Sequence, residues 1–324
     1  MKLIDTSALR QKVGYAEARQ HLGFGDKTWL LAAAIFIMSG LIVGGFMLQS
    51  FSVRSSKSPS VMTIVALLTL MVVVLPGMLW LAHRRRVMRA YRLLLFAQRN
   101  GMQFNWNTAP HGLATPLFFS GHSSKVRHEI ADSEGTLRIG GFHTVYGHGR
   151  GAHGCDFTYI AFPIGQHVPD MTIDSRSNNY IFGIRNLRVS RSGMKRVAIN
   201  PMFDEKWQVY AAPANTEKAR HFVQSTLVGT LSRVGKMYDI EVADGQASCY
   251  LPGSIDISIP NTMETVLAQA SIFANALGVK LTIAPDQQYA ERQATWRRYA
   301  SVRGSIMVVG FGAIVGMMVF FARL

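Results

Sequence analysis

Three long stretches of the chain consist of apolar and small residues without a charge. They are residues 29–48, 61–82 and 304–322. A helix of about 20 residues is about 30 Å long, which matches the hydrocarbon core of a bilayer. None of the stretches shows polar positions at helical spacing, which a helix packed on a protein core normally has. The pattern therefore predicts three membrane-spanning helices.

Shorter periodic segments follow the second stretch. Its helical pattern continues to Asn100 and Gly101, a typical signal for the end of a helix. Residues 136–147 and 155–164 alternate apolar and polar positions, which predicts two strands. The glycine-rich stretch between these strands predicts a hairpin connection.

The second half of the central region has clearer patterns. Residues 207–212 predict a strand, and helical spacing from Asn215 and again over 262–278 predicts two amphipathic helices. Between the helices, Asp244 and Gly245 form a turn signal typical of a β-hairpin.

These elements predict an α+β cytoplasmic domain flanked by transmembrane helices, two N-terminal and one C-terminal. We expect an N-terminal cytoplasmic segment 1–27, a transmembrane hairpin 28–83, the α+β domain with juxtamembrane helices 84–303, and a last transmembrane helix 304–322.

The basic charge is unevenly distributed. The chain has a net charge of +15, but the excess lies beside the apolar stretches, and residues 100–285 are nearly neutral. This distribution argues against a nucleic-acid partner. Arginines flank the second and third stretches at Arg84, Arg85, Arg86, Arg297 and Arg298. By the positive-inside rule they predict a multi-pass inner-membrane protein, with the lipid bilayer as a partner and the domain in the cytoplasm.

A resemblance points the same way. The segment FDEKWQVYAAPANTEKARHFVQSTLVGTLSRVGKMYDIEVADG and the earlier FHTVYGHGRG resemble, in the order of their features, a family of uncharacterised bacterial membrane proteins. That family has paired N-terminal spans, and the resemblance covers residues 100–255. It implies a membrane-attached domain and supplies no catalytic residues.

The most suggestive chemical cluster is a histidine-rich loop. Within residues 143–156 lie His143, His148, His153, Cys155 and Asp156. Imidazole and thiolate groups are zinc ligands, so the first four residues are a candidate metal site. The spacing matches no established metal motif, and a solvated glycine-rich loop is the competing interpretation. No cofactor is predicted otherwise, and both Cys155 and Cys249 also fit as buried small apolar residues.

Other signals are weaker. Gly40 with Gly44, and Gly312 with Gly316, place small residues one helical turn apart, as at close helix contacts. Asp170 and Asp174 fall on one face of a strand-like run and could act as a carboxylate pair, although exposed strand ends commonly carry such residues.

Two functional hypotheses follow. The first is a membrane-anchored cytoplasmic interaction or regulatory module, with a membrane or cytoplasmic protein or a second copy of itself as partner. The alternative is a membrane-bound metal-dependent or hydrolytic enzyme that uses the histidine-rich loop 143–156. The absence of a nucleophile elbow or a P-loop favours the first.

Overall fold

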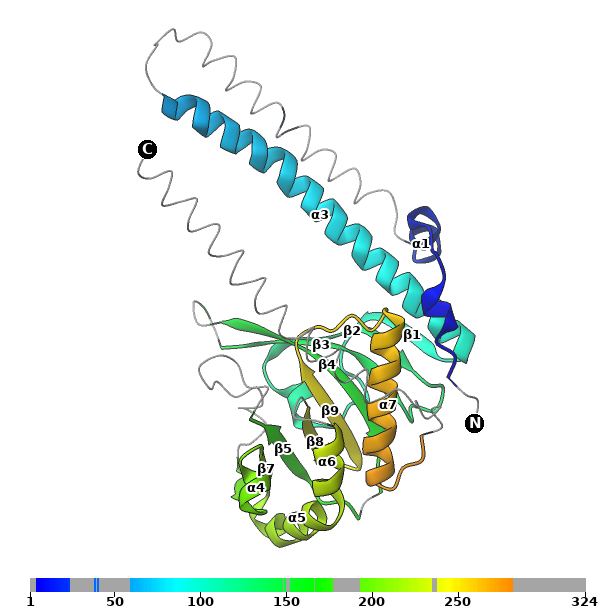
Figure 1. The fold of residues 1–324 in the computed structure, drawn as a ribbon, viewed down its shortest axis with the longest axis vertical. Helices are drawn as coiled ribbons and strands as arrows, with labels where there is room; N and C mark the ends of the chain where they lie inside the picture. The colour runs from blue at the N-terminus through cyan, green and yellow to red at the C-terminus, as the bar shows by residue number, and fades with distance from the viewer. Residues whose placement is uncertain are drawn as a thin grey trace. The chain divides into compact units, whose positions relative to one another are not determined.

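A nine-stranded sheet forms the centre of the fold (Figure 1). In this computed structural model the described residues are 4–23, 38, 40, 59–147, 149, 152–165, 167–176, 193–234 and 238–281. The strands are β1 (Gln103–Thr108), β2 (His122–Ala131), β3 (Arg138–Tyr146), β4 (His153–Pro163), β5 (Met171–Ser175), β6 (Lys195–Val197), β7 (Trp207–Ala211), β8 (Asp239–Ala243) and β9 (Gln246–Pro252). Their order is β1-β2-β3-β4-β9-β8-β5-β7-β6, and every neighbouring pair is antiparallel.

The described part of the chain also contains helices. They are α1 (Tyr15–His21), α3 (Pro59–Asn100), α4 (Pro201–Asp204), α5 (Thr216–Phe222), α6 (Val228–Val234) and α7 (Pro260–Ala276), with a π-helical turn, η5 (Val223–Leu227), joining α5 to α6. Short 3-10 turns are η1 (Ser7–Arg10), η2 (Pro116–Phe119) and η4 (Pro213–Asn215). The chain divides into two compact units, Ala8–Phe96 and the remainder.

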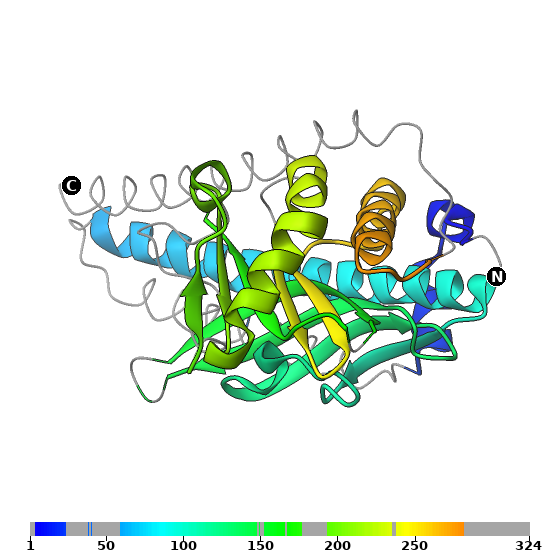
Figure 2. The ribbon, with the colours of Figure 1, turned by 90° about the horizontal axis from the view of Figure 1, so that it is seen from below.

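The two faces of the sheet have different covers. Successive strand residues point to opposite faces, and on β4 Phe157 and Tyr159 belong to a buried cluster with Phe118 of η2. Helices α6 and α7 lie on the other face (Figure 2), where Phe273 of α7 packs edge-on against Tyr238 with ring centroids 5.5 Å apart. The sheet is therefore buried on both sides over its central strands.

The smaller unit has its own packing. Ala18 of α1 and Val87 and Tyr91 of α3 form a buried cluster. The Tyr91 hydroxyl donates to Glu17 Oε1 at 3.0 Å. This hydrogen bond joins α1 to α3 through two residues that are 74 positions apart in the chain.

Several predicted elements are confirmed. Helix α3 ends at Asn100, and Gly101 follows it with a positive φ. Strands β8 and β9 form a hairpin whose turn residues Asp244 and Gly245 both have positive φ, as a tight hairpin turn requires. The predicted hairpin of β3 and β4 is also present, with Tyr146 opposite His153.

The prediction of membrane spans is contradicted. Among the residues that the structure describes, no helix is long and apolar enough to cross a membrane. Residues 61–82 form part of α3, while 29–48, apart from positions 38 and 40, and 304–322 lie outside the described residues. The fold class with flanking transmembrane helices, the description as a membrane protein and the multi-pass inner-membrane location are thereby corrected. Apolar composition misled because a run without polar positions has no periodicity that would show which environment it occupies.

Candidate functional site

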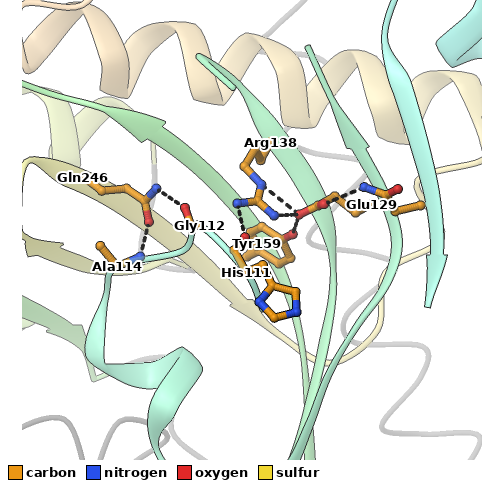
Figure 3. Close-up of polar contacts among 8 residues, drawn as sticks. His111, Gly112, Ala114, Glu129, Arg138, Tyr159 and Gln246 are labelled. Carbon is orange, nitrogen blue, oxygen red and sulfur yellow. Dashed lines mark hydrogen bonds and ion pairs between the residues drawn. The ribbon is translucent and has the colours of Figure 1, made fainter. Parts of the chain in front are cut away.

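Side chains of the sheet hold one connecting segment, residues 109–121, against the sheet face (Figure 3). We call it the covering segment. The Gln246 amide accepts from Ala114 N at 2.8 Å and donates to the Gly112 carbonyl at 3.2 Å. Arg138 Nη1 donates to the His111 carbonyl at 2.7 Å. These bonds satisfy backbone groups that have no strand partner, so the segment stays in place without belonging to the sheet.

Glu129 on β2 is the centre of the polar contacts beneath the segment. Its side chain is only 2% exposed, and its Oε2 accepts from Arg138 Nη2 at 2.7 Å and from Arg138 Nε at 3.0 Å. Its Oε1 accepts from Asn105 Nδ2 at 3.1 Å, and the Tyr159 hydroxyl also donates to Oε2. The carboxylate is therefore paired with a cation and hydrogen-bonded, the condition under which a buried charge is tolerated.

Gly140 makes this geometry possible. It lies on β3 opposite Tyr159 of β4, beside the stretch of β2 that contains Glu129, where the register of β2 with β3 is irregular. A Cβ at this position would lie 3.1 Å from Glu129 Cα and 3.2 Å from Tyr159 Cε1. The missing side chain lets the tyrosine ring cross β3 and bring its hydroxyl to the carboxylate.

A second tyrosine and glutamate meet on the same face. Tyr250 lies opposite Tyr159 in the pairing of β4 with β9. Its hydroxyl donates to Glu241 Oε2 at 3.1 Å, and the same oxygen accepts from Leu117 N in η2 at 3.0 Å. Thr115 donates to Ser248 Oγ at 3.0 Å and also contacts the Tyr250 hydroxyl. The covering segment thus bonds directly to Glu241, and it is linked to Glu129 through Arg138.

Burial keeps both tyrosines protonated. It raises the pKa of Tyr159, and the negative charge of Glu129 raises it further. The pKa of Tyr250 is raised by burial and then by Glu241. A protonated hydroxyl can donate to a carboxylate, so the two contacts persist across the physiological pH range. Since these groups are buried and directed at the chain itself, they hold structure and present no group to a ligand.

A second polar cluster is formed by side chains of strands β2, β3 and β4. His143 Nδ1 and Asp156 Oδ1 are 2.9 Å apart, and Arg127 Nη1 lies 3.6 Å from the same oxygen. The side chains of Arg127 and His143 are both partly exposed. The carboxylate orients the imidazole through Nδ1, and a Cβ at Gly154 would lie 3.1 Å from His143 Cε1. The absent side chain leaves that edge of the ring uncrowded.

The predicted zinc ligands are only partly placed. His148 and the side chain of His153 lie outside the described residues. Cys155 pairs with Thr144, one position along from His143, so its side chain points to the opposite face and joins the buried cluster under the covering segment. Within the described ranges no three metal-ligating side chains come together. The structure thus separates His143 from Cys155.

The other sequence candidates are distributed as follows. Arg84, Arg85 and Arg86 are exposed on α3, and the Arg84 guanidinium lies 5.5 Å from the centroid of the Trp80 ring. Arg297 and Arg298 lie outside the described residues, as do Gly44, Gly312 and Gly316. These arginines were predicted to set the orientation of the membrane spans, so that prediction depends on the spans themselves. Gly40 has no described atom within 4 Å of an added Cβ.

Acidic residues of the sheet differ most from expectation. Asp170 is exposed, but Asp174 is completely buried on β5. Asp239 and Glu241 on β8 are buried as well, and Asp239 Oδ1 accepts from Ser175 N at 2.8 Å. Alternation of acidic with apolar residues predicts one solvated face. The alternation is misleading here, because this sheet is covered on both faces and buries Asp174, Asp239 and Glu241.

The two edges of the sheet are built differently. Edge strand β6 has three residues, including the exposed Lys195 and Arg196. Edge strand β1 has six residues, QFNWNT, with neither charge nor proline. Gln103 and Asn107 on β1 are exposed, while the Trp106 ring packs edge-on against His128 with centroids 4.8 Å apart. Among described strands, β1 pairs with β2 alone.

Known proteins offer little guidance. No family model matches the chain, and no curated protein sequence matches it. The crystal structure of the mycobacterial trehalose monomycolate transport factor A, TtfA, is 12% identical, with a TM-score of 0.37, over 60% of this chain and 96% of that chain. A likeness at this level carries no argument about this protein. The resemblance of residues 100–255 to uncharacterised bacterial membrane proteins therefore stays a prediction.

Proposed function

We propose that this chain is an interaction module that binds a partner by strand addition at β1. The observation that supports this proposal is the contrast between the two sheet edges. Natural sheets protect their edges with short strands, lysine, proline or bulges, because an open edge recruits other strands. Edge strand β6 is short and basic. Edge strand β1 is twice as long and has none of these protections.

Strand addition also fits the chemistry of β1. Main-chain hydrogen bonds supply the affinity in this mode, and alternate side chains supply the specificity. Gln103 and Asn107 are the exposed positions. Their amides offer both donors and acceptors to an incoming strand. The partly buried Phe104 and Trp106 supply apolar contact.

Site-specific photo-cross-linking tests the proposal. A benzoylphenylalanine residue placed at Asn107 in the full chain should form a defined adduct in the native cell. The same residue at the exposed Asn275 of α7 is the matched control and should form none. Adding Gln103→Lys should abolish the adduct, since a charge is a standard protection of an edge. Equal adducts from both positions, or none from Asn107, would contradict strand addition.

The contact between His143 and Asp156 favours a second candidate, a hydrolytic enzyme. A carboxylate that accepts from Nδ1–H orients the imidazole and leaves Nε2 available as a base. Under this hypothesis the full chain should hydrolyse p-nitrophenyl acetate or p-nitrophenyl phosphate, and His143→Gln should remove that activity. Activity that survives the substitution would exclude His143 as the base.

A further inference from the structure

We infer that the strand that adds to β1 is β1 of a second copy, which joins two sheets about a two-fold axis. The inference rests on the proposed function and names its partner. Its first support is charge. Strand β1 contains no ionisable side chain, so a strand that carries charge finds no complementary group on β1, while a copy of β1 meets no like-charge repulsion.

The register of such a pair follows from the strand itself. Residues two apart on a strand share a face, so Asn105 and Asn107 lie on one face, with Phe104, Trp106 and Thr108 on the other. An antiparallel pair centred on Trp106 places Asn105 opposite Asn107 of the second copy. Amide faces amide on one side and Trp106 faces its own copy on the other. Both faces are therefore complementary to themselves.

Closure of the assembly is the second support. A two-fold pairing uses the same patch on both copies, so it ends at a dimer and does not propagate. The joined sheet then ends in two copies of β6, whose length and charge protect an edge. Pairing through β1 thus removes the one long unprotected edge among the described strands.

Sedimentation of the full chain tests this inference. We expect the wild type to sediment as a dimer, and the double variant Gln103→Lys with Asn107→Lys to dissociate roughly tenfold more readily, because like charges oppose strand pairing. Asn275→Lys, which adds a charge at an exposed position of α7, should leave the dimer unchanged. Mixing Asn107→Lys with Asn107→Asp should restore pairing between the two variants.

Two outcomes would overturn the dimer. If the double lysine variant dimerises as strongly as Asn275→Lys does, the copies meet at another surface. If the wild type is a monomer at all concentrations, β1 does not pair with itself. In that second case, an adduct from position 107 to a different protein leaves the proposed function standing, and the lack of any adduct removes both.

Discussion

Glu129 shows how a single residue organises the sheet face. Its carboxylate is buried and depends on Arg138 for a compensating charge. Removing one partner of a buried pair leaves an uncompensated charge, which costs about 3–5 kcal/mol. We therefore expect Arg138→Met to lower the free energy of unfolding in urea by about that amount. The matched control is Glu217→Gln, which breaks the exposed pair with Arg220 and should cost at most about 1 kcal/mol. Equal losses would show that the Glu129 pair is not buried in solution.

The cysteines give a second prediction at this scale. Cys249 is completely buried, and burial raises the pKa of its thiol. Since the thiolate is the reactive form, iodoacetamide at neutral pH should leave Cys249 unmodified in the folded chain and label it in urea. Cys155 is also buried, with 7% of its surface exposed, and should react slowly. Mass spectrometry of peptides measures both rates, and labelling of Cys249 at the same rate in both states would contradict its burial.

At the scale of elements, two glycines should respond oppositely to the same substitution. At Gly140 of β3 a methyl group meets the backbone of β2 at 3.1 Å, so Gly140→Ala should destabilise the chain by about 1–3 kcal/mol. At Gly229, exposed in α6 with no described atom within 4 Å, Gly229→Ala should stabilise it by about 0.5–1 kcal/mol. Urea unfolding of both variants measures the sign. A neutral Gly140→Ala would mean that Tyr159 does not cross β3 as described.

At the scale of the whole molecule, Asp5 near the beginning of the chain accepts a hydrogen bond from Arg99, 94 positions further along. Hydrogen bonds from Ser7 and then from Arg99 lower the pKa of Asp5 to about 2. A lowered pKa in the folded state means that the contact stabilises the fold above the ordinary carboxyl pKa and is lost as the pH falls through about 2. Titration of Asp5 by NMR should therefore give a midpoint near 2, and Arg99→Gln should move it upward. An ordinary midpoint in both proteins would show that the contact does not form.

The sequence by itself determined elements whose signals are local. The end of α3 at Asn100, the turn at Asp244 and Gly245, the hairpin of β3 with β4 and the helix α7 follow from short-range periodicity, glycine and turn chemistry. Strands β1 and β2 were missed because QFNWNT and HSSKVRHEIA are polar and give no clear alternation. The apolar stretches were assigned to a membrane on composition. Of these, 61–82 lies in α3, and no described helix is long and apolar enough to cross a membrane.

Only the tertiary structure decided which polar residues act together. Glu129, Arg138 and Tyr159 lie on three different strands, and their meeting depends on strand order and on the absent side chain of Gly140. The alternation of strand faces separates Cys155 from His143, and the same pairing brings Asp156 to His143. Register and sheet order arise from contacts between distant segments. Residue spacing along one segment cannot reveal them, so the candidate sites became visible only in the fold.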